Sequence, residues 1–173
     1  MSEQSFNVRQ ATIDDLDQVL DIWTRGIESS LGTPPPVTKD YKTYFAERLL
    51  DQTDVFSFTC AENAAGEVVG WISLSPFRSN PAVKGVMAEM SAYVDPTHVA
   101  SGVIGFAVKS VLENADVSPL QYIVAFTLVN NVGVLKLCDR FGFKLVGTYP
   151  VSPKAPDATP LAYLVRPCAF PAE

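Results

Sequence analysis

The sequence predicts a mixed α/β (α+β) fold, in which helices flank both faces of a mixed β-sheet. The chain has 173 residues, of which 47% are hydrophobic and 18% charged. This composition is typical of globular proteins, and a chain of this length buries roughly 70% of its unfolded surface. Strand and helix patterns follow one another in the order β-α-α-β-β-β-α-β-α-β-β, which favours helices packed on a sheet. We expect a single domain over residues 1–173.

The first strand and the first helix are predicted from the N-terminal residues. Residues 6–10 alternate briefly between apolar and polar types and predict a strand. Thr12 is expected to cap a helix, with Asp14 and Asp15 in its first turn, where the helix dipole favours negative charge. Apolar residues then recur every three or four positions over 13–27, which predicts one amphipathic helix.

A second helix and a hairpin follow. The run Pro34–Pro36 ends the first helix, because proline cannot continue one, and Thr38 is expected to cap the next. Segments 55–62 and 68–75 are rich in apolar residues and predict two strands. Asn63-Ala64-Ala65-Gly66 between them is typical of a hairpin turn.

The remaining elements alternate between strands and helices. Asp95-Pro96 ends one predicted strand, and Gly142 is expected to follow the last turn of the last helix. The predicted strands are 87–94, 121–128, 143–149 and 161–166, and the predicted helices are 102–114 and 132–140. A proline-rich loop, 150–160, joins the last two strands.

The charge balance restricts the partners of this protein. The net charge is −6 and the isoelectric point is about 4.7. Non-specific binding to nucleic acids or to anionic membranes needs a basic surface, so we do not expect either partner. Residues 1–60 hold 5 Lys+Arg against 10 Asp+Glu, whereas residues 61–173 hold 8 against 9. A ligand that carries phosphate is therefore expected in the second part.

Cysteine and histidine counts exclude several kinds of site. The three cysteines, Cys60, Cys138 and Cys168, are widely spaced and show no metal-binding pattern. His98 is the only histidine, so a histidine-based zinc site is excluded and no metal is expected. The chain has no apolar run long enough for a membrane span, and residues 1–9 show no signal-peptide pattern. We expect a cytoplasmic protein.

Four local patterns between Val8 and Tyr149 point to one family. They are Trp71–Arg78 (WISLSPFR) followed by Ala88–Val94 (AEMSAYV), then Val94-Asp95-Pro96 before His98, Asn131–Phe143 (NVGVLKLCDRFGF) and Val8–Asp15 (VRQATIDD). The first pattern is the most specific. With the element order, these patterns resemble the GNAT N-acyltransferase superfamily, and within it the phosphinothricin and methionine-sulfoximine N-acetyltransferase group.

The resemblance implies direct attack of an amine on the thioester of a phosphopantetheine donor, with acetyl-CoA as the default. The implied acceptor is a small-molecule amine such as an amino acid or an analogue. Physically, the reaction needs a base for the amine, stabilisation of the thioester oxygen, and backbone amides for the phosphates. Members of the group are often homodimers, so a homodimer is also expected.

Two residues match catalytic positions of the resembled family. Glu89 matches the glutamate of an E-x-S-x-Y-V strand and is the candidate general base, although an ordinary strand carboxylate is the alternative. Cys138 stands where the family has tyrosine, or this group histidine, as the acid for the leaving thiolate. A small buried apolar residue is the favoured interpretation of Cys138.

Donor binding is expected along the strand that contains Glu89 and at the turn that follows it. Tyr93 and Val94 match positions whose backbone meets the pantetheine arm, and Asn131 matches a second contact or a plain helix cap. The expected pyrophosphate loop consists of Val99, Ala100, Ser101, Gly102, Val103 and Ile104. Only Gly102 follows the family pattern there, Ile104 replaces a small residue, and His98 is the only nearby cation.

Three residues match the acceptor side of the resembled group. Phe77 and Arg78 lie in the loop after the WISLSP strand, and Arg78 could pair with an acceptor carboxylate or with surface acids. Glu28 lies where the family has a helix end over the acceptor pocket, and a solvated side chain is the alternative.

The unusual loop at 99–104 keeps two other functions open. One is an acyltransferase whose donor is a carrier-protein thioester or an aminoacyl-tRNA, and the charge of −6 disfavours the RNA version. The other is a GNAT-like protein that binds a ligand or a partner without catalysis. Glu89 favours catalysis, whereas the missing glycine and basic residues disfavour ordinary use of CoA.

Overall fold

A computed structural model describes residues 6–32, 40–78 and 80–169. Seven strands form one sheet in the order β1-β2-β3-β4-β5-β7-β6. Neighbouring strands are antiparallel except β4 and β5, which are parallel, so the predicted mixed sheet is confirmed. The strands are β1 (Asn7–Gln10), β2 (Phe58–Glu62), β3 (Val68–Pro76), β4 (Met87–Val94), β5 (Tyr122–Leu128), β6 (Lys144–Thr148) and β7 (Leu161–Pro167).

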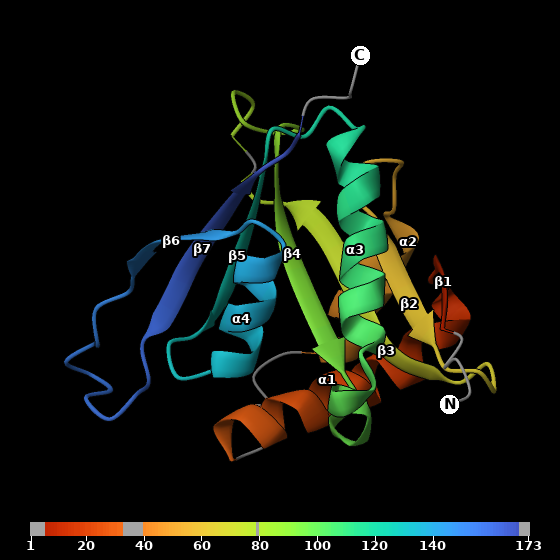
Figure 1. Ribbon diagram of the computed structural model, residues 1–173, viewed down its shortest axis with the longest axis horizontal. Helices are drawn as coiled ribbons and strands as arrows, with labels where there is room; N and C mark the ends of the chain where they lie inside the picture. Colours follow the sequence, from red (N-terminus) through yellow and green to blue (C-terminus); the bar gives the residue numbers. More distant parts are fainter. Residues whose placement is uncertain (1–5, 33–39, 79, 170–173) are drawn as a thin grey trace.

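Helices cover both faces of the sheet, as predicted (Figure 1). The α-helices are α1 (Leu16–Leu31), α2 (Tyr41–Leu50), α3 (Val103–Asp116) and α4 (Val132–Arg140), and two short 3₁₀ helices are η1 (Ile13–Asp15) and η2 (Pro96–Ser101). One buried cluster joins α1 and α2 to one face through Trp71 and Phe58, and another joins α3 to the opposite face through Ile72 and Leu74. Alternate residues of β3 therefore enter different cores.

Local hydrogen bonds explain where the first helices begin. The Thr12 backbone N–H donates to the Asp15 carboxylate at 2.8 Å, and Arg9 donates two bonds of 2.8 Å to the same carboxylate. The predicted cap at Thr12 is thus present, and η1 follows it before α1. The predicted cap Thr38 lies outside the described residues. Asp40 caps α2 by accepting a 3.1 Å bond from the Thr43 backbone N–H.

Most element boundaries agree with the sequence within two residues. Two elements differ more: α1 begins at Leu16 after η1 and ends at Leu31, and one strand begins three residues late. The strand predicted from residue 55 begins at Phe58, because the Thr53 hydroxyl accepts a hydrogen bond from the Phe56 backbone N–H and holds a turn there. The predicted hairpin at 63–66 is present, with a 3.0 Å bond from the Gly66 N–H to the Asn63 carbonyl. Gly142 follows α4 with a φ of 81°, as expected.

Strands β4 and β5 pair over only three residues each. Met87, Ala88 and Glu89 pair with residues 122–124, and β4 continues to Val94 without further pairing to β5. Figure 1 shows the two strands diverging beyond this paired segment. On its other side β4 stays paired with β3 from Ala88 to Val94, all of the strand except its first residue. The backbone of residues 90–94 is therefore unpaired on the β5 side.

Within the described part of the chain, no helix is long and apolar enough to cross a membrane. The same residues contain no group of three or more His, Cys, Asp or Glu side chains that could hold a metal ion.

Candidate active site

Glu89 lies at the last position where β4 and β5 pair. It stands opposite Val124 of β5 and opposite Ser75 of β3, and its side chain is half-buried. Burial raises the pKa of Glu89 above its ordinary value, and the positive charge of Arg48 partly offsets this by lowering it. A carboxylate with a raised pKa is a stronger base than an exposed one, so Glu89 is suited to accept a proton from an amine.

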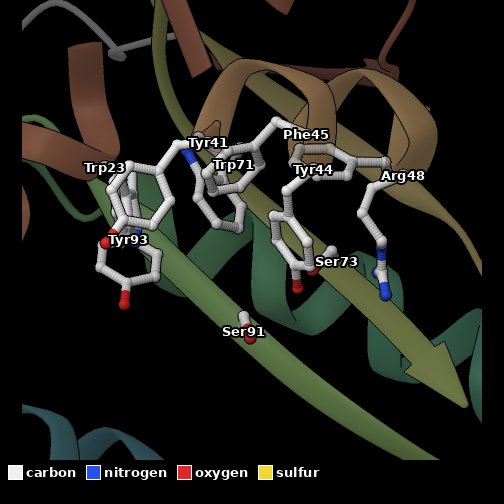
Figure 2. A pocket seen from close by; sticks show the side chains of 10 residues that line it. Trp23, Tyr41, Tyr44, Phe45, Arg48, Trp71, Ser73, Ser91 and Tyr93 are labelled. Carbon is white, nitrogen blue, oxygen red and sulfur yellow. The ribbon is translucent and has the colours of Figure 1, made fainter. Parts of the chain in front are cut away.

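A cavity of about 360 Å³ lies between helices α1 and α2 and the sheet face that bears Glu89. Its walls are mostly aromatic and are shown in Figure 2: Trp23, Tyr41, Tyr44, Phe45, Trp71 and Tyr93. Ser73 and Ser91 form its polar floor and stand opposite each other on β3 and β4. Ser91 is two residues from Glu89, so the two side chains share one face of β4 about 7 Å apart along the strand.

Arg48 is the one cationic residue among those that line this cavity. It is half-buried in the last turn of α2, and Figure 2 shows its guanidinium beside Tyr44, at the end of the cavity away from Tyr93. Arg48 was not predicted from the sequence as a cavity residue. Its spacing could have indicated that position, because Arg48 lies three or four residues after Tyr44 and Phe45 and therefore on the same face of the helix.

Tyr93 forms the wall at the opposite end of the cavity. Its ring lies 4.8 Å from the Trp71 ring, between centroids, and packs against Gly26 of α1. An ideal Cβ on Gly26 would lie 2.9 Å from Tyr93 Cδ1, so only glycine allows this approach. The predicted donor residue Tyr93 therefore directs its side chain towards the aromatic cavity, while its backbone belongs to the unpaired part of β4.

The expected pyrophosphate loop forms η2 and the first turn of α3. Gly102 has a φ of 82° and is the residue before α3, a conformation that favours glycine. Val99 and Ala100 are exposed, and Ser101 donates a 2.6 Å hydrogen bond to the His98 carbonyl. The N–H groups of the first helical turn have no partners further up the helix, so the start of α3 presents donors suited to an anion.

The Ile104 side chain packs towards Gly70 of β3. An ideal Cβ on Gly70 of β3 would lie 3.6 Å from Ile104 Cδ1, and Ile104 packs against the α3-side core, in which Val103 is fully buried. The departure from the family pattern at Ile104 is thus accommodated by the sheet, where Gly70 leaves room for it.

Asp95 anchors the turn between β4 and α3. It accepts a 2.9 Å bond from the Thr97 backbone N–H and a 2.8 Å bond from Arg25 of α1. These bonds hold the pKa of Asp95 below its ordinary value, although burial opposes them. Arg25 also pairs with Asp21, so its charge is already matched within the protein. The turn after Val94 is therefore fixed to α1.

Asn131 caps α4, with its side chain accepting a 3.2 Å bond from the Val134 backbone N–H. The plain cap is thus present, and contact with a donor stays a prediction. Cys138 lies on the same helix, and only 6% of its surface is exposed. It belongs to the α3-side core, where burial raises the pKa of its thiol. This environment favours the packing interpretation, and the role of Cys138 as an acid stays a prediction.

The predicted acceptor residues lie outside the aromatic cavity. Phe77 stacks with Phe126 and Tyr163, with 6.3 Å between its ring centroid and each of theirs. Arg78 is exposed and covers the Phe77 ring at 5.3 Å. Glu28 is exposed near the end of α1. None of these three lines the cavity next to Ser91.

The fold is that of an acyl-transfer enzyme, and comparison with known proteins agrees. The chain belongs to the acetyltransferase (GNAT) domain family, whose model matches residues 6–144. A relative from Bacillus subtilis (strain 168), named "Putative phosphinothricin acetyltransferase YwnH", is 29% identical over 146 residues, which cover 83% of this chain and 86% of the relative. The recognised family and its nearest group are therefore confirmed.

Solved structures share the whole fold. One, described as a putative phosphinothricin N-acetyltransferase, is 26% identical, with a TM-score of 0.81 over 95% of this chain and 99% of that chain. Another is a GNAT superfamily phosphinothricin acetyltransferase from Sinorhizobium meliloti in complex with acetyl-CoA. It is 19% identical, with a TM-score of 0.79 over 95% of this chain and 89% of that chain, and it supports the fold.

Proposed function

We propose that this GNAT acetyltransferase transfers the acetyl group of acetyl-CoA to the amine of a small molecule, with Glu89 as the general base. The observation that carries the proposal is the position of Glu89. It stands where β4 and β5 separate and on the face that holds the aromatic cavity. A donor between the strands and an acceptor in the cavity would therefore meet beside this carboxylate.

Several features support acetyl-CoA as the donor. The unpaired backbone of residues 90–94 offers hydrogen-bonding groups to the amides of a pantetheine arm. The first turn of α3 would present N–H groups to the pyrophosphate. The larger side chain of Ile104 is accommodated beside Gly70 of β3. Homologous proteins with this fold have been solved with acetyl-CoA.

In the proposed reaction Glu89 takes a proton from the ammonium or the attacking amine of the acceptor, directly or through water. The amine nitrogen forms a bond to the thioester carbonyl carbon, and the carbon–sulfur bond breaks. A backbone N–H of the unpaired segment of β4 would stabilise the negative charge on the carbonyl oxygen. The thiolate of CoA leaves and takes up a proton, for which Cys138 is the predicted but buried donor.

Calorimetric titration and a matched pair of variants test this function. Acetyl-CoA and CoA should bind with micromolar affinity, and Glu89→Gln should keep that affinity while kcat falls by about 100-fold or more. Glu113→Gln, on the exposed face of α3, removes a carboxylate far from the cavity and should keep full turnover. An undiminished rate in Glu89→Gln would exclude Glu89 as the base. Absence of binding at millimolar acetyl-CoA would favour a carrier-protein donor or a ligand-binding protein.

We further propose one domain over residues 1–173, acting in the cytoplasm as a homodimer. All seven strands join one sheet, and the three cysteines are unpaired, as is usual in reducing compartments. The edge strand β6 exposes Leu145 and Val146, each with more than half of its surface accessible. Such an edge favours a second copy. Light scattering should give twice the mass of one chain, and Val146→Lys should yield monomers.

A further inference from the structure

We propose that the acceptor is an α-amino acid with an aromatic or large apolar side chain, bound through its carboxylate by Arg48 and through its side chain by the aromatic cavity. This inference rests on the proposed function and names the acceptor class for that site. It assigns to Arg48 the carboxylate contact that the sequence had suggested for Arg78.

The cavity walls favour an apolar guest. The Trp23 ring lies 4.6 Å from Tyr41 and 5.4 Å from Phe45, and the Trp71 ring lies 4.8 Å from Tyr93, between centroids. Figure 2 shows these rings together over the floor formed by Ser91. A ring or a branched aliphatic group gains dispersion and burial against such walls, whereas a charged side chain would lose its hydration there.

The unmatched charge of Arg48 selects a carboxylate. Its guanidinium forms no ion pair or hydrogen bond with the described residues, and Glu89 attracts it only at longer range. A half-buried guanidinium is stabilised by a carboxylate, which it binds through two parallel hydrogen bonds. The cavity supplies no such carboxylate.

The positions of Arg48 and Glu89 suit the two polar groups of an α-amino acid. In such a molecule the amine and the carboxylate are attached to the same carbon, so the groups that bind them must lie in one region of the site. Arg48 and Ser73 line the same cavity, and Ser75, two residues along β3 on the same face, stands opposite Glu89. The side chain of the acceptor would then extend along Ser73 and Ser91 towards Tyr93.

Two other acceptor classes fit less well. An aromatic-walled cavity can bind an organic cation, but a purely cationic amine would leave Arg48 unmatched and be repelled by it. An amino acid with a second acidic group needs a second cation. Arg25 is already paired with Asp21 and Asp95, and exposed Arg78 covers Phe77 outside the cavity.

A binding measurement that needs no turnover tests the cavity. Trp23 and Trp71 are the only tryptophans of the chain, and both line the cavity, so selective tryptophan excitation reports its occupancy. L-Phenylalanine should change the fluorescence saturably, in wild type and in the presence of CoA, and L-glutamate should not. No saturable change with L-phenylalanine, or a tighter response to L-glutamate, overturns the proposal.

Kinetics with matched substrates and variants test Arg48. Arg48→Gln should raise the KM for L-phenylalanine about 10- to 100-fold, the loss expected for a charge-assisted pair. It should lower, or at least not raise, the KM for phenethylamine, which lacks the carboxylate and is repelled by Arg48 in the wild type. Lys42→Gln removes a cation from the exposed side of the same helix and should change neither KM. A selective rise in Arg78→Gln, with Arg48→Gln unaffected, would return the carboxylate contact to Arg78.

The proposed acceptor class and the proposed acetyltransferase function can be disproved separately. If acetyl-CoA binds and acidic or cationic amines are acetylated more efficiently than phenylalanine, leucine and tryptophan, the acceptor class is wrong and the proposed function stands. If acetyl-CoA does not bind, the proposed function itself fails.

Discussion

Gly26 of α1 touches the ring of Tyr93 on β4 so closely that a methyl group would lie 2.9 Å from Tyr93 Cδ1. This contact fixes how near α1 lies to the sheet, and with it the width of the aromatic cavity between them. A glycine inside a helix usually lowers stability by about 1 kcal/mol relative to alanine. Here the close approach outweighs that cost.

Gly26→Ala is therefore expected to lower stability by about 1–3 kcal/mol, as overpacking does, in spite of its better helix propensity. Displacement of Tyr93 should also alter the tryptophan fluorescence and raise the acceptor KM. Thermal unfolding and steady-state kinetics measure both effects. Ser29→Ala, on the exposed part of α1, is the matched control. A more stable Gly26→Ala protein with an unchanged KM would contradict the contact.

The pH profile should report the coupling of Glu89 to Arg48. Only the deprotonated carboxylate can act as a base, so kcat/KM should rise with pH through the pKa of Glu89, which burial places above its ordinary value. The Arg48 charge lowers that pKa, so Arg48→Gln should shift the rising limb to higher pH. Measured with phenethylamine, the shift is independent of carboxylate binding. A rising limb at the same pH in both proteins would contradict the coupling.

Glu89 should also lower the stability of the free enzyme at neutral pH. Burial raises its folded-state pKa, so the folded protein binds more protons than the unfolded chain between the two values, and stability falls as pH rises through that range. Glu89→Gln should then unfold at a higher temperature than wild type at neutral pH, with the difference shrinking near the ordinary pKa of glutamate. Calorimetric scans at several pH values measure this. A lower melting temperature in Glu89→Gln at neutral pH would refute it.

Substitutions of Ile104 and of Gly102 should distinguish a role in side-chain packing from a role in anion binding. Ile104→Ala removes the contact above Gly70 and should cost about 2–4 kcal/mol of stability, with CoA affinity nearly unchanged. Gly102→Ala forces a side chain into a φ of 82° and should weaken CoA binding, because the start of α3 must shift. Chemical unfolding and calorimetric titration distinguish the two. Equal loss of affinity in both variants would show that Ile104 faces the donor.

Asp15 should contribute stability that disappears in acid. Hydrogen bonds from Arg9 and from the Thr12 backbone hold its pKa below the ordinary value, although burial opposes them. This contribution is fully present above the unfolded pKa of aspartate and is lost as pH falls through the folded pKa. Asp15→Asn should cost about 2 kcal/mol at neutral pH and almost nothing in strong acid. The same cost at every pH would contradict the charged pairing with Arg9.

The sequence predicted the strand and helix order because its apolar periods are clear and its turns are marked by proline and glycine. Glu89 was found through its neighbours, since the AEMSAYV strand carries a recognisable pattern. Arg48 was missed because its importance depends on α2 packing over β3 and β4, a relation between residues about 40 positions apart. Arg78 was considered for its place beside the WISLSP strand, with a surface ion pair as an equal alternative, and its side chain covers Phe77.

The inward turn of Ile104 likewise could not be predicted. A pattern comparison records only that a small residue has become large. Whether the larger side chain blocks a ligand depends on the direction of its Cα–Cβ bond and on the space that Gly70 leaves in another strand. The change from a small residue to Ile104 is therefore accommodated within the fold by packing beside Gly70.

The short pairing between β4 and β5 divides the sheet into two parts. One part contains β1 to β4 and the other contains β5, β7 and β6. Three residue pairs between β4 and β5 join the two parts. Because Glu89 belongs to the last of these three pairs, its backbone is held by both parts of the sheet, whereas the residues of β4 beyond it are held by β3 alone.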